Sequence, residues 1–455
     1  MSTAHSSSMP RSMRTFFIIW LGQAISLIGS SLTNFGLGVW IYQQTGQATP
    51  FALTALASTL PGILLSPFAG ALVDRWDRRR VMILTDTGAA LVTLVVLALL
   101  LSGKLVVWQI YILALVGSAL SAFQEPAYMA SITVLVPKEQ FARASGLVQT
   151  GQAIGQLIAP VLGGALVVSI GLQGVIIIDL TTFLFAVGAL LFIHIPRPEQ
   201  SAEGAAASGT LLHEAAQGWH YIRARAGLLG ILISFAAFNF LANIAAVTMA
   251  PLVLSFAQAD VLGLIQSAGG AGMLIGSIVM SSWGGTKRRI YTVYGALIVS
   301  SAGLFIAGLR PSGWVVGLGL FILLGGIPFV SAASQAIWQA KVPPDLQGRV
   351  FATRSVVSRS AMPIAYLLAG PLADQVFEPL LMEGGALAST IGTVLGTGPG
   401  RGMGLMFVTM GALCLLVTSM SVLHPRIRRV ELEIPDYAPV AMSQTAATAL
   451  QPGDD

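Results

Sequence analysis

Long apolar stretches alternate with short polar ones along nearly the whole chain. Each apolar stretch is close to the roughly 20 residues that an α-helix needs to cross the hydrocarbon core of a bilayer. The short alternating segments that would indicate a membrane β-barrel do not recur. The pattern predicts an all-α polytopic membrane protein with twelve spans, over residues 16–42, 49–73, 80–101, 106–134, 144–168, 172–194, 227–255, 261–283, 289–309, 314–340, 350–374 and 403–423.

Composition supports this prediction. The chain is 55% hydrophobic and 9% charged, with a mean hydropathy of +0.79, whereas a soluble domain is about 25% charged. The single cysteine, Cys414, excludes a disulfide framework and a cysteine metal site, and no cofactor or metal is predicted. No cleavable signal peptide is expected, because Met1–Arg14 lacks the apolar core of one and the first apolar stretch is long enough to span.

Basic residues predict the orientation. Of the 24 lysines and arginines, 20 fall on the side that holds both termini, three fall on the other side, and Arg359 lies within a span. Because basic loops remain on the cytoplasmic side, both termini are expected in the cytoplasm and the protein in the inner (plasma) membrane. The net charge of +5 follows this topology and does not indicate nucleic-acid binding.

Short sequence matches divide the chain into two related halves. Val136-Pro137 matches Val342-Pro343 at an offset of 206, as does Arg143 with Arg349. This favours parallel six-helix repeats with a binding site where they meet. The expected segments are a cytoplasmic tail (1–15), an N-terminal bundle (16–194), a cytoplasmic linker with an amphipathic helix (195–226), a C-terminal bundle (227–424) and a disordered cytoplasmic tail (425–455). The Gly-rich stretch 375–402 is expected to be a mobile loop.

The densest cluster of charge follows the second span. Residues 74–80 contain six charges, preceded by Gly70 four residues before Asp74. Plain topology explains the arginines, which stop helices on the inside. Our interpretation adds a gate, in which Gly70 lets a neighbouring helix approach and Asp74 faces the positive N-terminus of another helix.

These features resemble the major facilitator superfamily. Gly70, Asp74, Arg75, Arg78 and Arg79 match its loop signature between helices 2 and 3. A second signature in span 5 is similar to the antiporter motif of drug exporters and consists of Gly146, Gly155, Pro160, Gly163 and Gly164.

Local likenesses point to the macrolide-efflux and siderophore-exporter branch of that family. They include Trp20–Leu27, Gly272–Gly276 and Ala361–Ile364. The resemblance implies two six-helix bundles that rock around a central cavity, with export driven by proton antiport. Many relatives carry an arginine in span 4 where this chain has Gly117.

Ionisable residues within spans are costly and indicate function. Glu125 and Asp179 are the proton-coupling candidates, since burial can raise a carboxyl pKa towards neutrality; a packing role for Glu125 stays open. Asp86 is interpreted as a gate residue that pairs with the loop arginines, and Arg359 as an embedded cation in an ion pair. Gly272 and Gly276 are expected to pack helices within the bundle.

The resemblance implies a cavity lined by spans 1, 4, 7 and 10. The amide and aromatic candidates there suit a bulky, partly apolar substrate; they are Gln23, Asn34, Phe235, Asn239, Asn243, Gln335 and Trp338. We therefore expect a monomeric, non-enzymatic exporter whose partners are a small-molecule substrate, protons and the lipid bilayer. Export of an endogenous metabolite such as a siderophore is the alternative, and a non-transporting sensor or lipid-handling protein is the alternative from another class.

Overall fold

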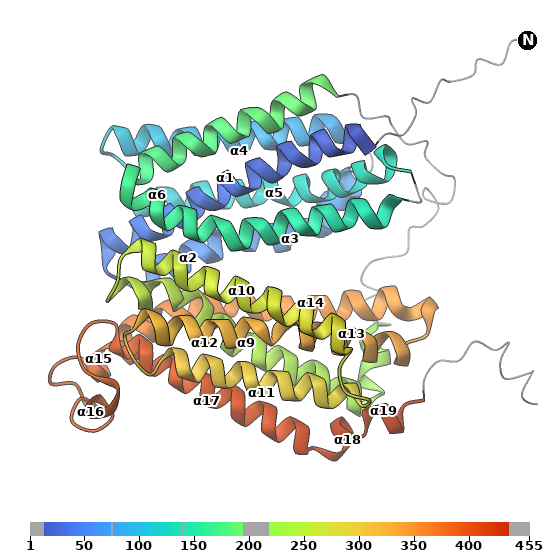
Figure 1. Cartoon of the computed structure of the whole chain (residues 1–455), viewed down its shortest axis with the longest axis vertical. Helices are drawn as coiled ribbons and strands as arrows, with labels where there is room; N and C mark the ends of the chain where they lie inside the picture. Colours follow the sequence, from blue (N-terminus) through green and yellow to red (C-terminus); the bar gives the residue numbers. More distant parts are fainter. Residues whose placement is uncertain (1–12, 74–75, 138–139, 194–217, 436–455) are drawn as a thin grey trace, which may run out of the picture.

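The protein consists of helices arranged in two bundles. The computed structural model describes residues 13–73, 76–137, 140–193 and 218–435, and no strand occurs in them. The bundle built from the first half lies above the bundle built from the second half in Figure 1, and the long helices of both run in nearly the same direction. The all-α fold class predicted from the sequence is confirmed.

The N-terminal half contains α1 (Met13–Thr45), α2 (Ala48–Ala57), α3 (Leu60–Val73), α4 (Arg78–Leu101), α5 (Val107–Leu135) and α6 (Phe141–Phe192). The long helices of the C-terminal half are α9 (Ala226–Leu254), α10 (Ala259–Trp283), α11 (Arg289–Ala307), α12 (Gly313–Gly325), α13 (Ile327–Lys341), α14 (Pro344–Pro371) and α17 (Arg401–Leu423). Short elements complete this half: a π-helical turn (Leu372–Phe377), α15 (Glu378–Leu381), α16 (Gly392–Leu395), α18 (Pro425–Arg428) and α19 (Val430–Glu433).

Eleven helical stretches of the described residues are long and apolar enough to cross a membrane. One of them, Gly146–Leu191, has 46 residues and would extend about 70 Å as a straight helix, twice the thickness of the bilayer core. It is divided at Gly171, whose φ of 69° and ψ of 176° reverse the chain. Only glycine adopts such a conformation readily, so the stretch forms two spans and the count is consistent with twelve.

The second span is broken between α2 and α3, at Ser58 and Thr59. Pro61 follows the break and has no N–H with which to continue the helical hydrogen bonds. The N–H of Gly62 donates instead to the hydroxyl of Ser118 on α5, at 3.1 Å. A side chain of another span therefore satisfies the interrupted backbone.

The two ends of the bundles differ in what they carry. One end, which we call the Asp374 end, holds Gly171 and the segment 375–400 with α15 and α16, at the left of Figure 1. The other, which we call the terminal end, holds residues 13 and 435, the two ends of the described chain.

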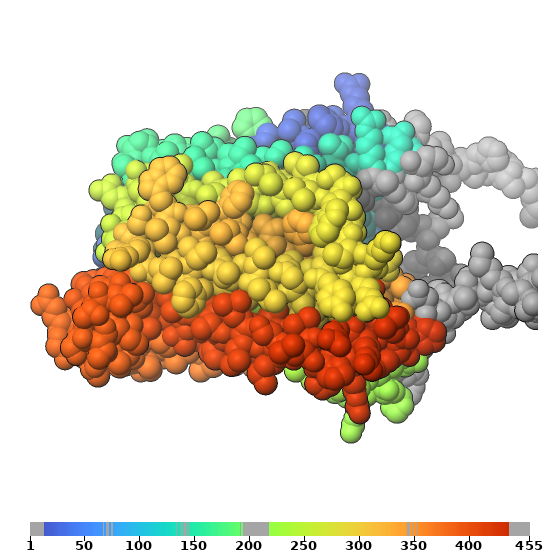
Figure 2. All heavy atoms as spheres, turned by 60° about the horizontal axis from the view of Figure 1, so that its bottom comes forward, coloured from blue at the N-terminus to red at the C-terminus, as the bar shows by residue number. Residues whose placement is uncertain are grey.

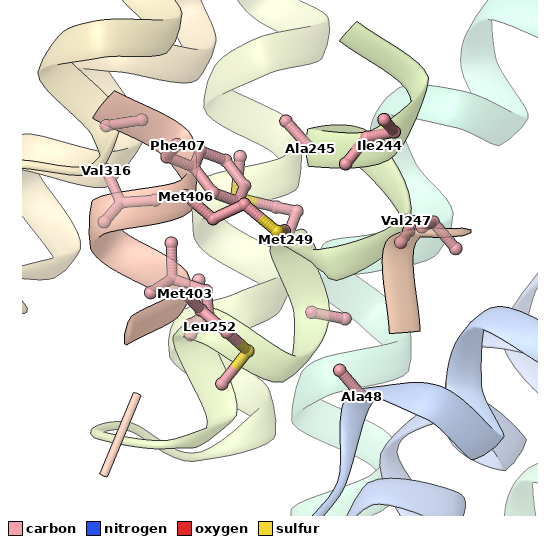
Figure 3. Packing of buried hydrophobic residues seen from close by; sticks show 14 of the residues in the cluster. Ala48, Ile244, Ala245, Val247, Met249, Leu252, Val316, Met403, Met406 and Phe407 are labelled. Atoms are coloured by element: carbon pink, nitrogen blue, oxygen red, sulfur yellow. The ribbon is translucent and has the colours of Figure 1, made fainter. Parts of the chain in front are cut away.

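A large apolar core joins the halves at the Asp374 end. It is built mainly from α9, α10, α12 and α17 and also includes Val39, Ala48 and Ala52 from the N-terminal half. Figure 3 shows Ala48 at the edge of this cluster, whose other labelled members belong to the C-terminal half. Separate cores lie nearer the terminal end, one within each half.

Two segments expected to lack fixed structure are packed. Residues 425–435 form α18 and α19, where Ile427 and Val430 are buried, so the predicted disordered tail is wrong for this stretch; residues 436–455 lie outside the described chain. Residues 375–400 fold around buried Leu381 and Leu395 and form the orange-red lobe at the left of Figure 2. Apolar residues of both segments pack against helices of the C-terminal half. The composition of the segments alone does not reveal these packing partners.

Most of the predicted amphipathic linker helix, up to residue 217, lies outside the described chain. Its described part, residues 218–223, is helical and packs on the C-terminal half. Ile222 is fully buried, and the Tyr221 hydroxyl donates to the Lys341 carbonyl oxygen at 2.7 Å. This part therefore contacts protein on at least one face.

Candidate functional site

The halves cross most closely where the first limb of α6 meets α10. A Cβ on Gly164 would lie 2.5 Å from the Ala259 carbonyl oxygen, and one on Gly263 would lie 2.2 Å from the Pro160 carbonyl oxygen. Only glycine permits backbones to approach this closely. The Ser267 hydroxyl adds a hydrogen bond across the halves, to the Leu157 carbonyl oxygen at 2.7 Å.

The predicted antiporter motif therefore divides into two parts. Gly163 lies against the Phe35 ring and Gly164 against the α10 backbone, while Gly155 and Pro160 line a cavity between the halves. Gly146 is exposed, and a Cβ there would meet no atom within 4 Å. The part near Pro160 forms the inter-half crossing, and the part near Gly146 does not.

A second inter-half contact joins α2 to the end of α14. The Asp374 carboxylate accepts hydrogen bonds from the backbone N–H groups of Ala48 and Thr49, at 2.9 and 2.7 Å, and from the Thr49 hydroxyl. A carboxylate at this position satisfies free N–H groups of the helix and interacts favourably with its positive N-terminal end. Gly370 lies on Thr49, since a Cβ there would be 2.4 Å from the Thr49 Cα.

A cavity of about 360 Å³ lies between the halves, beside these contacts. It is lined by α1, α2 and α6 on one side and by α9 and α10 on the other. Its polar lining includes Ser31, Asn34, Gln156 and Gln266. Of the predicted cavity residues, Asn34 is thus brought to the inter-half surface.

A larger cavity, of about 510 Å³, lies within the N-terminal half among α1, α2, α4 and α5. Asp179, on the second limb of α6, forms part of its wall and is 4% exposed. The Ser30 hydroxyl donates to Asp179 Oδ1 at 3.2 Å. Gly117 also lines this cavity, and a Cβ on it would meet no atom within 4 Å.

A chain of hydrogen bonds connects α4, α5 and α1 nearer the terminal end. The Thr85 hydroxyl donates to the Gln124 amide oxygen, and Gln124 Nε2 donates to Gln23 Oε1 at 3.2 Å. Gln23 Nε2 then donates to Asp86 Oδ2 at 2.9 Å. The three hydrogen bonds run in one direction, from Thr85 through Gln124 and Gln23, and end on the Asp86 carboxylate. Asp86 is 8% exposed.

Glu125 lies beside this chain, with its side chain exposed to a third cavity of about 300 Å³. Gln23, Gln124 and Tyr128 line the same cavity. Of the two proton-coupling candidates, Glu125 is therefore open to a cavity, whereas Asp179 is buried in the wall of another.

The gate residues are described only in part. Gly70 lies on α3, and Asp74 and Arg75 lie outside the described chain. Arg78 donates to the Ala130 carbonyl oxygen at 2.7 Å, and Arg79 donates to carbonyl oxygens at the end of α6. The predicted pairing of Asp86 with the loop arginines is therefore wrong for these two: their guanidinium groups donate to backbone carbonyl oxygens, while Asp86 accepts from the Gln23 amide.

The candidates from the C-terminal half do not meet at either the inter-half cavity or the larger N-terminal one. Trp338 is 1% exposed and belongs to an apolar core, and Gln335 accepts a hydrogen bond from Arg354 at 3.1 Å. The half-buried Asn239 and Asn243 donate to backbone carbonyl oxygens of their own helix, and the half-buried Phe235 packs against the same core as Trp338.

The expected ion pair of Arg359 is not found among the described residues, and its side chain is exposed. Arg354, on the same helix, is half-buried, lies 5.4 Å from the Trp338 ring centroid and donates to Ser334 and Gln335. Helical phase, which span length alone does not define, decides which of the two arginines faces the bundle.

The sequence analysis missed several residues of these sites, among them Thr33, which lines the cavity with Asp179, and Asp374. Thr33 follows Ser30 by three positions and precedes Asn34, so this polar group on one helix face was a detectable signal. Asp374 bonds to residues 325 and 326 positions away, and no local pattern indicates such a pairing.

Comparison with known proteins finds a matching family and several similar transporters. A sequence model of the Major Facilitator Superfamily matches residues 19–366. The chain is 28% identical to macrolide efflux protein A of Streptococcus pyogenes, over 79% of this chain and 90% of that protein. It is 24% identical to the enterobactin exporter EntS of Shigella flexneri, over 75% and 81%. The structure resembles an inward-facing bacterial homologue of the human lysosomal transporter Spinster, with a TM-score of 0.69, 16% identity and coverage of 95% and 100%.

Proposed function

Because this chain belongs to the Major Facilitator Superfamily, we propose that it exports amphiphilic small molecules in exchange for protons, by alternating access across the inner (plasma) membrane. Its relatives and its fold are those of transporters, which are not enzymes. Efflux is the activity named for its curated relatives.

The observation that carries the proposal is the cavity between the two halves, next to their tight crossing at the Asp374 end. A site between two bundles becomes accessible from the opposite side when the bundles tilt. Together with the 20 basic residues predicted on the terminal side, the contacts at the Asp374 end correspond to a state closed to the outside. In this proposal the protein is a monomer with both termini in the cytoplasm.

Asp74 keeps its proposed role as the contact that closes the opposite, cytoplasmic side. A carboxylate against a helix N-terminus is favourable by up to about 2 kcal/mol when partly buried. The inter-half bond of Asp374 to α2 is a precedent for that chemistry within this molecule.

Proton coupling requires a carboxylate that releases and rebinds its proton during the cycle. Glu125 is the first candidate, because it combines exposure to a cavity with a position beside the buried chain that ends on Asp86. Asp179 is the second. Exchange of one proton for one substrate across one pH unit provides about 1.4 kcal/mol, enough for about tenfold accumulation.

The proposal is tested in proteoliposomes with an acidic interior, using a panel of macrolides, other amphiphilic drugs and siderophores. At least one substrate should accumulate about tenfold per pH unit, and an ionophore that collapses the gradient should abolish this. Accumulation of siderophores alone would favour the alternative of metabolite export. Absence of accumulation across the panel would contradict transport and favour a sensor or lipid-handling role.

Glu125→Gln tests the coupling residue in the same assay. Accumulation should fall to the level without a gradient, while binding of the substrate persists, because the amide keeps the shape but takes up no proton. Glu433→Gln, at an exposed position of α19, is the matched control and should transport normally. Unchanged accumulation in Glu125→Gln would transfer the coupling role to Asp179.

A further inference from the structure

The cavity of about 510 Å³ within the N-terminal half has a lining that selects the charge of its occupant. It is distinct from the cavity between the halves, but Asn34, Gly38 and Phe51 line both. The Phe51 ring lies directly on Gly38, where a Cβ would be 2.7 Å from the ring. Asn34, Gly38 and Phe51 therefore belong to the boundary that the two cavities share.

Several hydroxyl groups of this lining already donate a hydrogen bond to another group of the protein. Thr54, Ser58 and Ser121 donate to carbonyl oxygens of their own helices, at 2.9, 2.9 and 3.0 Å. Ser30 donates to Asp179. A hydroxyl that has donated its proton retains only lone pairs, so these four groups offer an incoming molecule acceptors rather than donors.

Asp179 adds a full negative charge when ionised, and it is 4% exposed. Among the described residues, no basic side chain forms an ion pair with it. A buried charge without a partner is costly, so the carboxylate requires either a proton or a cation from outside the protein chain.

Thr33 adds a second polar group at the same place. It is 6% exposed, lines the cavity and faces the Asp179 carboxylate, and no other hydrogen-bond partner of its Oγ1 lies among the described residues. A Thr33 hydroxyl that donates to Asp179 retains only lone pairs, so the Thr33 oxygen and the Asp179 carboxylate together form an acceptor pair at one place on the wall.

Apart from Asn34, Thr93 and Ser118, the rest of the lining is apolar or glycine and includes Leu37, Ile41, Val92, Val96 and Leu113. The volume lies within the range of small-molecule pockets, about 300–1,000 Å³. A bare metal ion gains nothing from such apolar walls, whereas an organic cation buries its hydrocarbon part against them.

We propose that this cavity is a substrate subsite for the protonated amine of an amphiphilic molecule, with Asp179 and Thr33 accepting the N–H hydrogen bonds. The inference rests on the proposed export function and names the chemical class of its substrate. It assigns Asp179 to substrate recognition, whereas Glu125 remains the first candidate for proton coupling.

The test is direct binding, without any gradient, to the full-length protein in lipid nanodiscs. The probes are dansylcadaverine, which carries a primary ammonium, and its N-acetyl derivative, which has the same fluorophore and chain but no charge. The wild-type protein should bind the cationic probe about tenfold more tightly or better, as expected for charge-assisted hydrogen bonds. Equal affinities, or no binding of either probe, would overturn the inference.

Three variants locate the binding. Asp179→Asn should abolish the preference for the cation, and Thr33→Val should weaken cation binding about two- to tenfold, with recovery in Thr33→Ser. Gly117→Leu fills the cavity from a position where a Cβ meets open space, so it should weaken both probes in a folded protein. Retention of the preference in Asp179→Asn, or normal binding in Gly117→Leu, would contradict the assignment.

Two controls separate this inference from others. Replacing potassium by sodium at constant ionic strength should leave probe binding unchanged; loss of binding in sodium would identify a metal-cation site instead. Glu433→Gln should bind like the wild type. If binding follows this pattern but the proteoliposomes show no proton-driven accumulation, the proposed function fails while the subsite stands, and the reverse result refutes the subsite alone.

Discussion

The two halves share a helical plan but differ in their interiors. The N-terminal half encloses the cavity lined by Asp179 and the hydrogen-bond chain that ends on Asp86. In the C-terminal half, helices meet backbone against backbone: a Cβ on Gly272 would lie 2.2 Å from the Phe321 carbonyl oxygen, and one on Gly276 would lie 2.2 Å from that of Gly325. The C-terminal half, which we call the packed half, also has a hollow of about 470 Å³ beside α10 and α12, but it is lined mainly by glycines and apolar side chains. The halves therefore differ in the polarity of their cavities and in how closely these helices approach each other.

Carboxylates follow the same division. In the C-terminal half they bind helix N-termini: Glu378 accepts from backbone N–H groups at the start of α17, and Glu431 accepts from those of Arg289 and Ile290. In the N-terminal half, Asp77 also caps a helix, α4, whereas Asp86, Glu125 and Asp179, which lie within spans, accept from side chains or line cavities. In the function proposed above, the C-terminal half is the scaffold, and the N-terminal half contributes these carboxylates to recognition and coupling.

The largest effect is expected from placing the same side chain into each interior. Gly272→Leu forces a side chain into the α12 backbone and should destabilise the protein by about 1–3 kcal/mol or more, lowering the unfolding temperature by about 5–10 °C. Gly117→Leu enters open space and should leave it nearly unchanged. Thermal unfolding of the purified variants in detergent measures both.

Equal losses in the two variants would refute the contrast between the halves. A smaller loss at Gly272 than at Gly117 would reverse it. Gly146→Leu, on an exposed position with no atom within 4 Å of a Cβ, provides the baseline for a leucine added to the surface of the N-terminal half.

Features that depend on one helix could be predicted from the sequence. Span positions follow from apolar length, and the packing of Gly272 and Gly276 within the bundle is confirmed by their contact with α12. Gly163 and Gly164 were recognised as part of the antiporter-like signature, and the structure supplies their partners, Phe35 and α10.

Features that depend on distant partners could not be predicted. An amide and an aromatic side chain such as Gln335 and Trp338 are typical of a cavity wall. Here, however, Gln335 accepts a hydrogen bond from Arg354, and Trp338 is enclosed by the apolar core. Residues 425–435 have the composition of a tail, yet Ile427 and Val430 fit against Gly230 and Gly227. In each case the partner lies on another element, so the outcome depends on the tertiary arrangement.

An intermediate effect is expected at Asp374, whose carboxylate caps a helix of the other half. Asp374→Asn removes the charge at the start of α2 and should weaken the closed state by about 1–2 kcal/mol, a shift of about 5–30-fold in the conformational equilibrium. Spin labels at Ser102→Cys and Glu383→Cys, in a Cys414→Ser background, report the distance across the Asp374 end by pulsed electron resonance.

The matched control for this variant is Glu378→Gln, whose cap lies within the C-terminal half. It should lower stability without changing the distance distribution. An unchanged distribution in Asp374→Asn would show that the crossing at Gly164 and Gly263 alone keeps this end closed.

The smallest effect is expected where a carboxylate acts only as a cap inside the packed half. Glu431→Gln keeps an oxygen for one of the N–H groups of Arg289 and Ile290, which now donate to separate carboxylate oxygens, but places an NH2 group at the other and loses the charge at the start of α11. The cost should be about 0.5–1 kcal/mol, seen as about two- to fivefold faster hydrogen exchange at those amides. Exchange of peptides covering residues 286–296 measures it, and Glu433→Gln should leave it unchanged. Faster exchange along the whole of α11 would mean that Glu431 supports the packing of the C-terminal half and not merely one helix end. A carboxylate of that half would then do more than cap a helix, and the difference between the carboxylates of the two halves would be smaller than their contacts indicate.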